Sequence, residues 1–251
     1  STYGPERRPV DARNVERSLE NSMQYIFTVT DLGLGDPETP AEENWDRMAT
    51  YGSNAPAHAE ARRKAVLALQ AHTMEFHEHD VEFGYEYESA AVVPDGSISQ
   101  SAQNFKIFTP EARPGHPLPH AWIDDTASVR RSTLDLVDGE AFTVIAGEDG
   151  AAWLEAAKVL SSEGFPLNAV SIGHLRGDYF DARLRWEMVR GHGPTGAVLV
   201  RPDRCVAFRA HGAVEDATQV LRQVLAQILG KPVHEESQPL LQQPSLKGSI
   251  S

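Results

Sequence analysis

Histidine and carboxylate side chains gather most densely in residues 72–80, which read HTMEFHEHD. His72, His77, His79 and Asp80 are of types that bind zinc, and zinc sites often take ligands at short spacings. His77 and His79, however, fall near the predicted end of a helix, where residues two apart do not share a face. Histidine near a helix C-terminus is also stabilising in its own right. The stretch therefore favours a solvated helix end, with metal binding as the alternative.

Cysteine chemistry is limited to one residue, Cys205, so neither an internal disulfide nor a Cys-x-x-Cys redox pair can form. Cys205 stands in an apolar run that is typical of a strand. We expect a buried, inert thiol rather than a nucleophile. A single cysteine also fits the reducing cytoplasm, which is the predicted location.

Motifs for nucleophilic catalysis and for phosphate binding are missing from the sequence. It has no G-x-S-x-G elbow, no G-x-G-x-x-G after a strand and no G-x-x-x-x-G-K-[ST]. A Ser-His-Asp set could be assembled from the ten histidines, but nothing anchors a hydrolase interpretation. We expect His116 and His120, which lie between prolines, to fix an extended segment by hydrogen bonds. No catalytic, cofactor-binding or metal-binding residue is assigned.

Size and charge exclude several classes of protein. At 251 residues the chain can form one large or two small domains with a real core. Its formal net charge of −13 disfavours non-specific nucleic-acid binding, although a small anionic or aromatic ligand stays possible. No apolar run approaches the ~20 residues of a membrane helix, and the polar start STYGPERRPV is not a secretory signal. We expect neither nucleic acid nor membrane as a partner.

The first part of the chain predicts helices. Residues 5–27 have an apolar face at helical spacing, in which Pro9 fits only the first turn or a kink. That face consists of Val15, Leu19, Met23 and Phe27, with Ile26 beside it. Residues 31–57 read as a loop with a short helix at 42–49, and residues 57–78 as the next helix. Residues 85–93 predict a strand, which ends at the turn Pro94-Asp95-Gly96.

A Pro-rich stretch, residues 97–120, separates this part from an α/β pattern. It reads as a linker or a wrapped extended segment, and the domain boundary is placed there. Phe105 and Phe108, with Trp122, are expected to pack on a partner surface, a neighbouring domain or the core.

The C-terminal part predicts a thioredoxin-like α/β sandwich. The expected order is strand 132–136, strand 141–146, helix 150–162, strand 167–172, helix 182–190, a hairpin within 196–210 and helix 214–229. Gly164 is expected to end the first of these helices. The loop Gly147-Glu-Asp-Gly150, where a redox-active member would carry its cysteines, has none. The Gln-, Ser- and Pro-rich residues 232–251 are expected to be a disordered tail.

Several motifs along the chain resemble those of the FAD-dependent phenol and aromatic hydroxylases, the phenol and chlorophenol hydroxylase type in particular. Each motif is weak alone, but the ordered set covers residues 3–230. The motifs are Tyr3-Gly-Pro-Glu-Arg-Arg-Pro-Val10, Ala61-Arg-Arg-Lys-Ala65, Glu75-Phe-His77, the run from Val81 to Gly96, residues 113–123, residues 132–147, Trp153, Pro166 to Gly173, and Gly196 to Asp203.

This resemblance implies an α/β fold in which residues 1–96 are the C-terminal part of a flavin and substrate domain, including one strand. Residues 97–120 would be the linker and residues 121–231 the thioredoxin-like domain. The family uses NAD(P)H to reduce FAD and transfers one oxygen atom of O₂ to a phenolic ring. Its FAD-binding motifs lie N-terminal to the region that this chain resembles. The resemblance thus implies an N-terminal FAD-binding chain or fragment as partner, a phenolic substrate and an oligomer of the assembled enzyme.

Two interpretations from different classes stay open. In the first, the chain, which starts at Ser1, is one piece of a split or nicked flavin hydroxylase, and the apolar face of residues 15–27 packs on the other piece. In the second, it is a non-catalytic binding or assembly module, because a thioredoxin-like fold without redox cysteines often serves as an interaction surface. An unrelated thioredoxin-like protein is a third.

Overall fold

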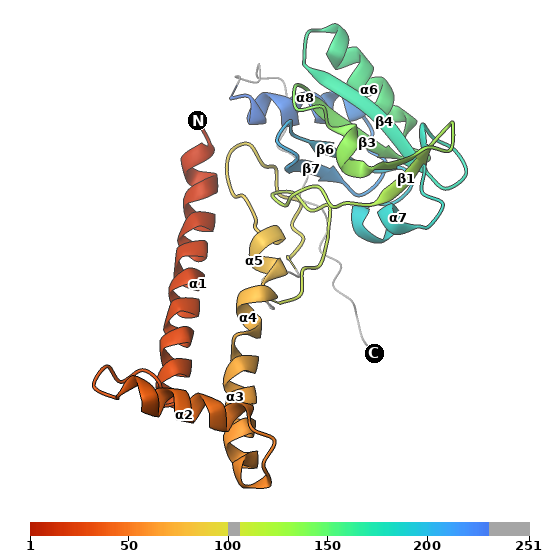
Figure 1. Ribbon diagram of the computed structural model, residues 1–251. Coiled ribbons are helices and arrows are strands. Elements are labelled where there is room, and N and C mark those ends of the chain that lie inside the picture. Colours follow the sequence, from red (N-terminus) through yellow and green to blue (C-terminus); the bar gives the residue numbers. More distant parts are fainter. Residues whose placement is uncertain (100–105, 231–251) are drawn as a thin grey trace, which may run out of the picture.

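The computed structural model describes residues 1–99 and 106–230. They form a helical arm followed by an α/β unit (Figure 1). Within these residues no helix is long and apolar enough to span a membrane. The predicted tail and Phe105 lie outside the described residues, and the predicted domain boundary at residues 97–120 stays a prediction.

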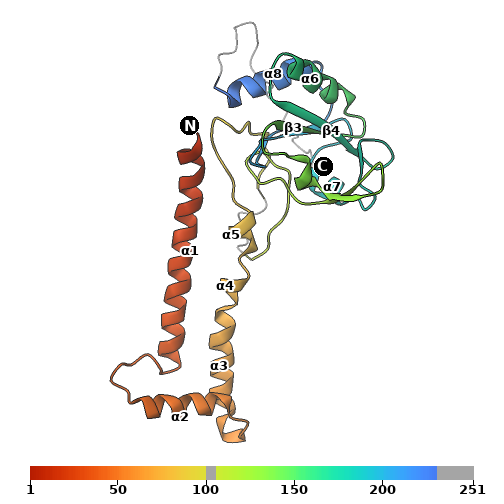
Figure 2. The ribbon, with the colours of Figure 1, turned by 45° about the horizontal axis from the view of Figure 1, so that its top comes forward.

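The arm is built from helices that run away from the sheet and return to it. Helix α1 (Tyr3–Asp31) runs outward, α2 (Ala41–Gly52) crosses the far end, and α3 (Ala59–Ala71) returns beside α1 after the 3₁₀ turn η1 (Pro56–His58). Figures 1 and 2 show this hairpin from two directions. The short helices α4 (Thr73–Phe76) and α5 (His79–Phe83) continue the return. Pro9 lies inside α1, beyond its first turn, and the helix begins two residues before the expected start.

A seven-stranded mixed sheet forms the α/β unit, in the order β2-β1-β5-β4-β3-β6-β7. Its strands are β1 (Trp122–Asp125), β2 (Arg130–Ser132), β3 (Phe142–Gly147), β4 (Leu167–Gly173), β5 (Tyr179–Phe180), β6 (Ala197–Val200) and β7 (Val206–Ala210). β3 pairs in parallel with β4, and β6 pairs antiparallel with both β3 and β7. This arrangement confirms the predicted thioredoxin-like sandwich.

Helices cover both faces of the sheet because its central strands are apolar on both sides. On one face α6 (Ala151–Ser162) and α8 (Ala217–Ile228) pack on Phe142, Val144 and Leu199. On the other face Trp186 of α7 (Arg185–Arg190) packs on Ile145 and Val198. Gly164, with φ +94°, ends α6 as expected. The sheet therefore provides a rigid base to which the arm can be fastened.

Two predicted strands are wrong. Residues 132–136 form the end of β2 and then the 3₁₀ turn η3 (Thr133–Leu136). Ser132 caps that turn by accepting from the Leu134 N–H, while Asp135 accepts from the Ser132 N–H. This capping box competes with strand pairing. β1 and the two-residue β5, which were not predicted, are short and bounded by polar residues.

Residues 85–93, the strand expected in the N-terminal part, form no strand either. The segment turns at Ser89, whose hydroxyl accepts from the Ala91 N–H. Single backbone hydrogen bonds join Tyr87 N–H to the Gly115 carbonyl and Val93 N–H to the Ala207 carbonyl. The segment therefore contacts the β7 side of the sheet at separate points instead of along a ladder.

Candidate functional site: the exposed face of α1 and its ion-paired junction

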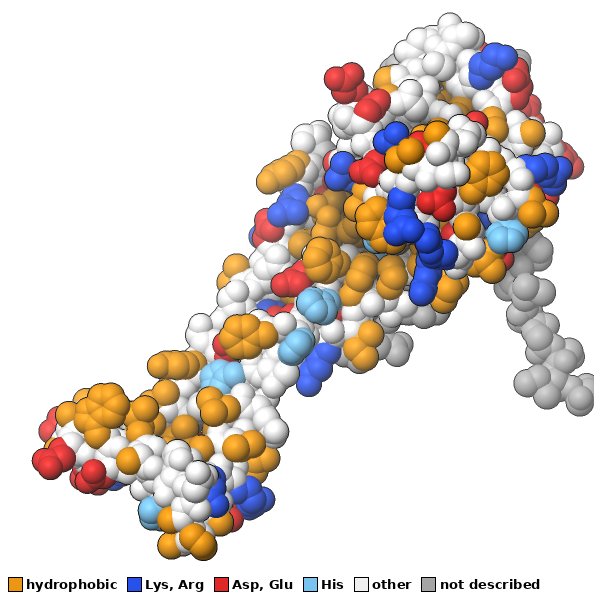
Figure 3. All heavy atoms as spheres, turned by 45° about the vertical axis from the view of Figure 1, so that its right-hand side comes forward, with side chains coloured by type: hydrophobic (Ala, Val, Ile, Leu, Met, Phe, Trp, Pro, Cys, Tyr) orange, Lys and Arg blue, Asp and Glu red, His pale blue; other side chains and the backbone are white. Residues whose placement is uncertain are grey.

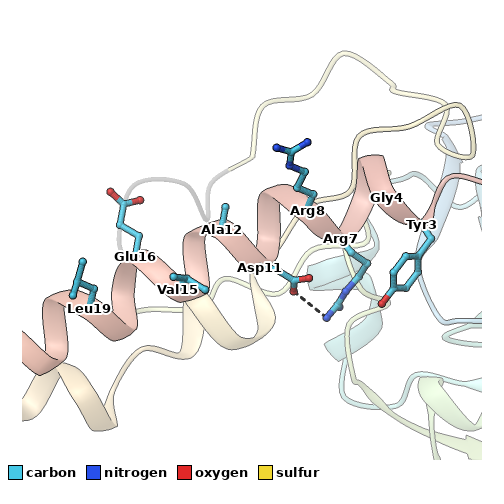
Figure 4. Close-up of a pocket in the computed structure, with 9 residues that line it drawn as sticks. All are labelled: Tyr3, Gly4, Arg7, Arg8, Asp11, Ala12, Val15, Glu16 and Leu19. Carbon is cyan, nitrogen blue, oxygen red and sulfur yellow. Dashed lines mark hydrogen bonds and ion pairs between the residues drawn. The ribbon is translucent and has the colours of Figure 1, made fainter.

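The apolar face of α1 lies open to solvent. Val15 is 69% exposed, Leu19 63%, Ile26 53% and Phe27 55%. Val15 and Leu19 lie on an open stretch of surface along the first half of the same helix, which only α1 residues line (Figure 4). Helical faces with this much apolar surface normally pack on another element. The exposure confirms that the predicted stripe does not serve the core of this chain.

An ion pair between α1 and the sheet holds the start of this helix. Arg201, which directly follows β6, donates to both carboxylate oxygens of Glu6 at 2.5 and 3.0 Å. The Ser89 hydroxyl donates to Glu6 at 2.6 Å. Glu6 and Arg201 are 195 residues apart, and Glu6 is buried. Bidentate pairing of this kind fixes orientation as well as distance. α1 is therefore set at a defined angle to the sheet.

A second set of ion pairs joins Asp95 and Glu111 to Arg209 of β7. Arg209 Nε donates to Asp95 Oδ2 at 2.6 Å, and its Nη1 donates to Glu111 at 3.2 Å. The side chains of Arg209 and Asp95 are only 2% and 5% exposed. Burial alone would raise the pKa of Asp95, but hydrogen bonds from Ser97 and Arg209 outweigh it and lower the pKa. The pair is thus a buried, fully ionised contact.

A third contact closes the junction around the extended segment. Arg113 donates to Glu86 at 2.5 Å and to the Ser97 carbonyl at 2.8 Å. His116 is buried, with its Nε2 3.2 Å from Arg113 Nη1 and 3.6 Å from Glu86. His120 makes a 2.7 Å hydrogen bond to the Ser132 hydroxyl. Neither histidine faces a reaction site among the described residues.

Acid is expected to open this junction before the sheet unfolds. The pKa values of Glu6, Glu86 and Asp95 are all lowered, since hydrogen bonds and Arg charges outweigh burial. Groups with a lowered folded-state pKa add stability above the unfolded-state pKa, about 4, and lose it as pH falls through the folded value. Hydrogen exchange from pH 5 to 2.5 should show α1 losing protection first. Glu6→Gln should flatten this pH dependence, and simultaneous loss of α1 and sheet protection would contradict the expectation.

A small core behind the junction contains Cys205. It consists of Val10, Tyr87, Val92 and Cys205, with Tyr85 against it. Burial raises the pKa of the Cys205 thiol to about 12, although Arg201 nearby lowers it in part. Tyr85 in the same core has its pKa raised to about 12, again by burial first. The expected buried thiol is confirmed.

Cys205 should consequently be unreactive in the folded chain. A thiol with this pKa has almost no thiolate at pH 8, and the thiolate is the nucleophile. An aromatic disulfide reagent should modify it only after denaturant is added. The matched control is a variant with a cysteine at exposed Ser161, which should react within seconds to minutes. Rapid labelling of Cys205 in the native protein would contradict the burial of this core.

Side chains of the histidine-rich stretch join helices of the arm. His72 Nε2 lies 2.8 Å from the Thr28 hydroxyl of α1, and its Nδ1 contacts Glu75. His79 contacts Glu82, and the His77 and His79 rings are 6.3 Å apart. Among the described residues no group of three or more His, Cys, Asp or Glu side chains could hold a metal. Asp80 is buried and accepts from Arg13.

The turn between β3 and α6 does not fit a dinucleotide phosphate. Glu148 accepts from the N–H groups of His174 and Leu175, and Arg176 pairs with Glu148 and Asp149. Two carboxylates beside this turn disfavour a phosphate there, because like charges repel. A Cβ on Gly147 would lie 2.4 Å from the Pro194 carbonyl oxygen, so the neighbouring loop also closes this turn. The described residues therefore offer no FAD phosphate site here.

The aromatic residues near the linker have different surroundings. Phe108 stacks on Phe83 of α5 with ring centroids 5.9 Å apart, which places it against a neighbouring helix. Trp122 is 47% exposed and meets His120 edge-on. Sequence reasoning missed the charged junction entirely. The available signal was Arg209, a charge inside the apolar strand Val-Ala-Phe-Arg-Ala.

The α/β unit matches the model of one protein family, described as aromatic-ring hydroxylase, C-terminal. The family model with that description matches residues 111–232, and this part of the chain belongs to that family. More particularly, the chain is similar to phenol 2-monooxygenase of Pseudomonas sp. (strain EST1001), with 33% identity over 90% of this chain and 37% of the relative. It is equally similar, at 33%, to 2,4-dichlorophenol 6-monooxygenase of Delftia acidovorans, over 91% of this chain and 39% of that one.

Solved structures agree with this assignment. The flavin-dependent monooxygenase PieE, determined in complex with FAD and substrate, superposes with a TM-score of 0.79 at 31% identity. The superposition covers 92% of this chain and 40% of PieE. The chain therefore spans well under half the length of the relatives that it matches.

Proposed function

We propose that this chain is the C-terminal part of a FAD- and NAD(P)H-dependent monooxygenase that hydroxylates a phenolic or other aromatic ring. The observation that carries the proposal is similarity to phenol and dichlorophenol monooxygenases over nine-tenths of the chain, helical arm included. The reaction would combine the substrate, O₂, NAD(P)H and a proton, and yield the hydroxylated ring, NAD(P)⁺ and water. Its proposed location is the cytoplasm.

In this proposal the chain positions other groups and does not hold the flavin phosphates. The β3–α6 turn offers no phosphate site, so FAD would be held mainly by an N-terminal flavin-binding part. The open face of α1 is the proposed contact with that part, because it has four large apolar side chains more than half exposed. The Glu6–Arg201 and Asp95–Arg209 pairs would then fix the flavin-binding part relative to the sheet. The division into residues 1–96, 97–120 and 121–231 is part of the same proposal.

The test is turnover by the assembled protein. Oxidation of NAD(P)H and consumption of O₂ should both rise on addition of a phenol, with one hydroxylated product formed per NAD(P)H oxidised. A non-aromatic alcohol serves as the control. An assembled protein that contains FAD but oxidises NAD(P)H at the same rate with and without any phenol would contradict hydroxylation of phenols.

A further inference from the structure

Helix α7 covers part of one face of the sheet with only six residues (Figure 1). Its Trp186 is completely buried against β3 and β6. The Asp181 carboxylate accepts from the Arg185 N–H at 2.8 Å and from the Glu187 N–H at 2.9 Å, so it caps the first turn. A helix this short depends on such contacts, because its own backbone hydrogen bonds do not sustain it. The buried ring and the capping carboxylate therefore hold α7 closed on the sheet.

The residue directly before α7 has a strained backbone. Leu184 has φ 54° and ψ 26°, which lie in the left-handed region. The Cβ atom of a leucine crowds the following carbonyl oxygen there, so the conformation is unfavourable. Gly191, directly after α7, has φ 66°, which a glycine adopts readily. The closed position of α7 therefore stores strain at the start of the helix.

Three buried nitrogen atoms around α7 have no hydrogen-bond partner within residues 1–99 and 106–230, namely Trp186 Nε1, Arg190 Nε and His192 Nε2. Arg190 and His192 are each only 8% exposed. The three side chains are neighbours, because Trp186 and Arg190 lie one helical turn apart and the ring centroids of Trp186 and His192 are 6.3 Å apart. Arg190 Nη2 is 4.0 Å from Glu187 Oε2, and that carboxylate is itself exposed. Buried polar groups without partners destabilise the closed position.

The His192 ring is a neutral group among positive ones. Its Nδ1 lies 2.8 Å from the Gly193 carbonyl oxygen, so Nδ1 carries the hydrogen. Burial lowers the pKa of His192 to about 4; the hydrogen bond opposes this change, and Arg190 of α7, Arg209 of β7 and His211 after β7 add to it. Of the carboxylates around these groups, two pair with Arg209 and one meets Arg190, as described above. Lys and Arg side chains also gather on the face of the α/β unit seen in Figure 3.

We infer that α7 is a pH-sensitive flap on the sheet, which opens when His192 takes up a proton. Opening would hydrate the three unpartnered nitrogen atoms, release the strain at Leu184 and give the charged imidazole access to water. The burial of Trp186 and the Asp181 cap oppose opening, so α7 stays closed while His192 is neutral. This opening belongs to the α/β unit and does not depend on the proposed function.

The two positions of α7 differ in how strongly His192 binds a proton, and this difference sets the direction of the pH dependence. The pKa of His192 is about 4 in the closed position, against an ordinary value of 6.5 once the ring is exposed. The open form therefore binds more protons between pH 6.5 and 4, and the closed form loses stability as the pH falls through that range. The carboxylates of the α1 junction have lowered pKa values and lose their charge only at lower pH.

Hydrogen exchange of the assembled protein from pH 8 to 5, corrected for the intrinsic exchange rate at each pH, tests the flap. Protection of the α7 amides should fall at least about tenfold, while protection of β3 stays constant. His192→Gln should keep α7 protection constant over the same range, because glutamine takes up no proton. The control His79→Gln removes an exposed histidine of the arm and should keep the wild-type fall.

A second variant tests the buried charge without changing His192. Arg190→Met removes the unpartnered guanidinium and should raise α7 protection at pH 8 at least about threefold. Flavin content is measured in parallel, so that the result is read apart from that for the proposed function. Wild-type α7 protection that does not change with pH would overturn the inference. So would a His192→Gln variant that keeps the wild-type fall, or an Arg190→Met variant that is less protected than the wild type.

Discussion

Arg209→Met is expected to lower the free energy of unfolding by about 3–5 kcal/mol, because removal of one partner leaves a buried charge unpaired. The charge in question is Asp95, whose side chain is 5% exposed and has lost the 2.6 Å hydrogen bond from Arg209. Methionine keeps most of the side-chain volume, so a cavity contributes little. Urea unfolding, followed by circular dichroism, measures the change.

A matched surface pair and a double variant make this result specific. Arg176→Met also removes a guanidinium that pairs with two carboxylates, but Arg176 is 72% exposed, so we expect at most about 1 kcal/mol. Asp95→Asn combined with Arg209→Met should recover part of the loss, since residue 95 then carries no unpaired buried charge. Equal losses for Arg209→Met and Arg176→Met would show that the β7 junction is not a buried ion pair.

Val15→Asp with Leu19→Asp is expected to abolish the binding of the flavin-containing part without unfolding this chain. Burial of such a side chain contributes about 1.5–3 kcal/mol, and each 1.4 kcal/mol is tenfold in affinity. Loss of two such side chains should raise the dissociation constant for the flavin-containing part at least about a hundredfold. Flavin absorbance retained on the affinity-tagged chain after washing is the measurement.

The control for this variant is Met188→Asp, an equally exposed apolar residue on α7, where Met188 is 73% exposed. It should retain flavin at the wild-type level. Circular dichroism should show unchanged helix content for both variants, because Val15 and Leu19 belong to no core cluster of residues 1–99 and 106–230. Full flavin retention by the α1 variant would place the contact elsewhere.

The helices and the buried strands could be predicted from the sequence because their apolar residues follow a local pattern. β3 and β4 are largely apolar, with Thr143, Asn168 and Ser171 as the polar positions, and α8 repeats its apolar residues at helical spacing, so the sequence pattern indicates these elements. Residues 85–93 and 132–136 have strand-like composition, but hydroxyls at Ser89 and Ser132 bind backbone N–H groups and turn the chain. A local side-chain hydrogen bond of this kind leaves no period in the sequence.

One part of the candidate site could likewise be predicted from the sequence, and the other part could not. The apolar face of α1 was predictable because its residues recur at helical spacing, and its exposure agrees with a missing partner surface. The ion-paired junction was not predictable, because Glu6 and Arg201 are 195 residues apart and Asp95 and Arg209 are 114 residues apart. Charged residues that meet only through the fold look like ordinary surface residues in the sequence.

Purification of this chain with everything bound to it tests the central claim most directly. The eluate should be yellow, with flavin absorbance bands, and mass spectrometry should find the polypeptide sequence carrying G-x-G-x-x-G, either joined to this chain or bound to it. NAD(P)H with a phenol should bleach and restore those bands repeatedly. A colourless, fully folded chain that binds no flavin-containing polypeptide would contradict the account.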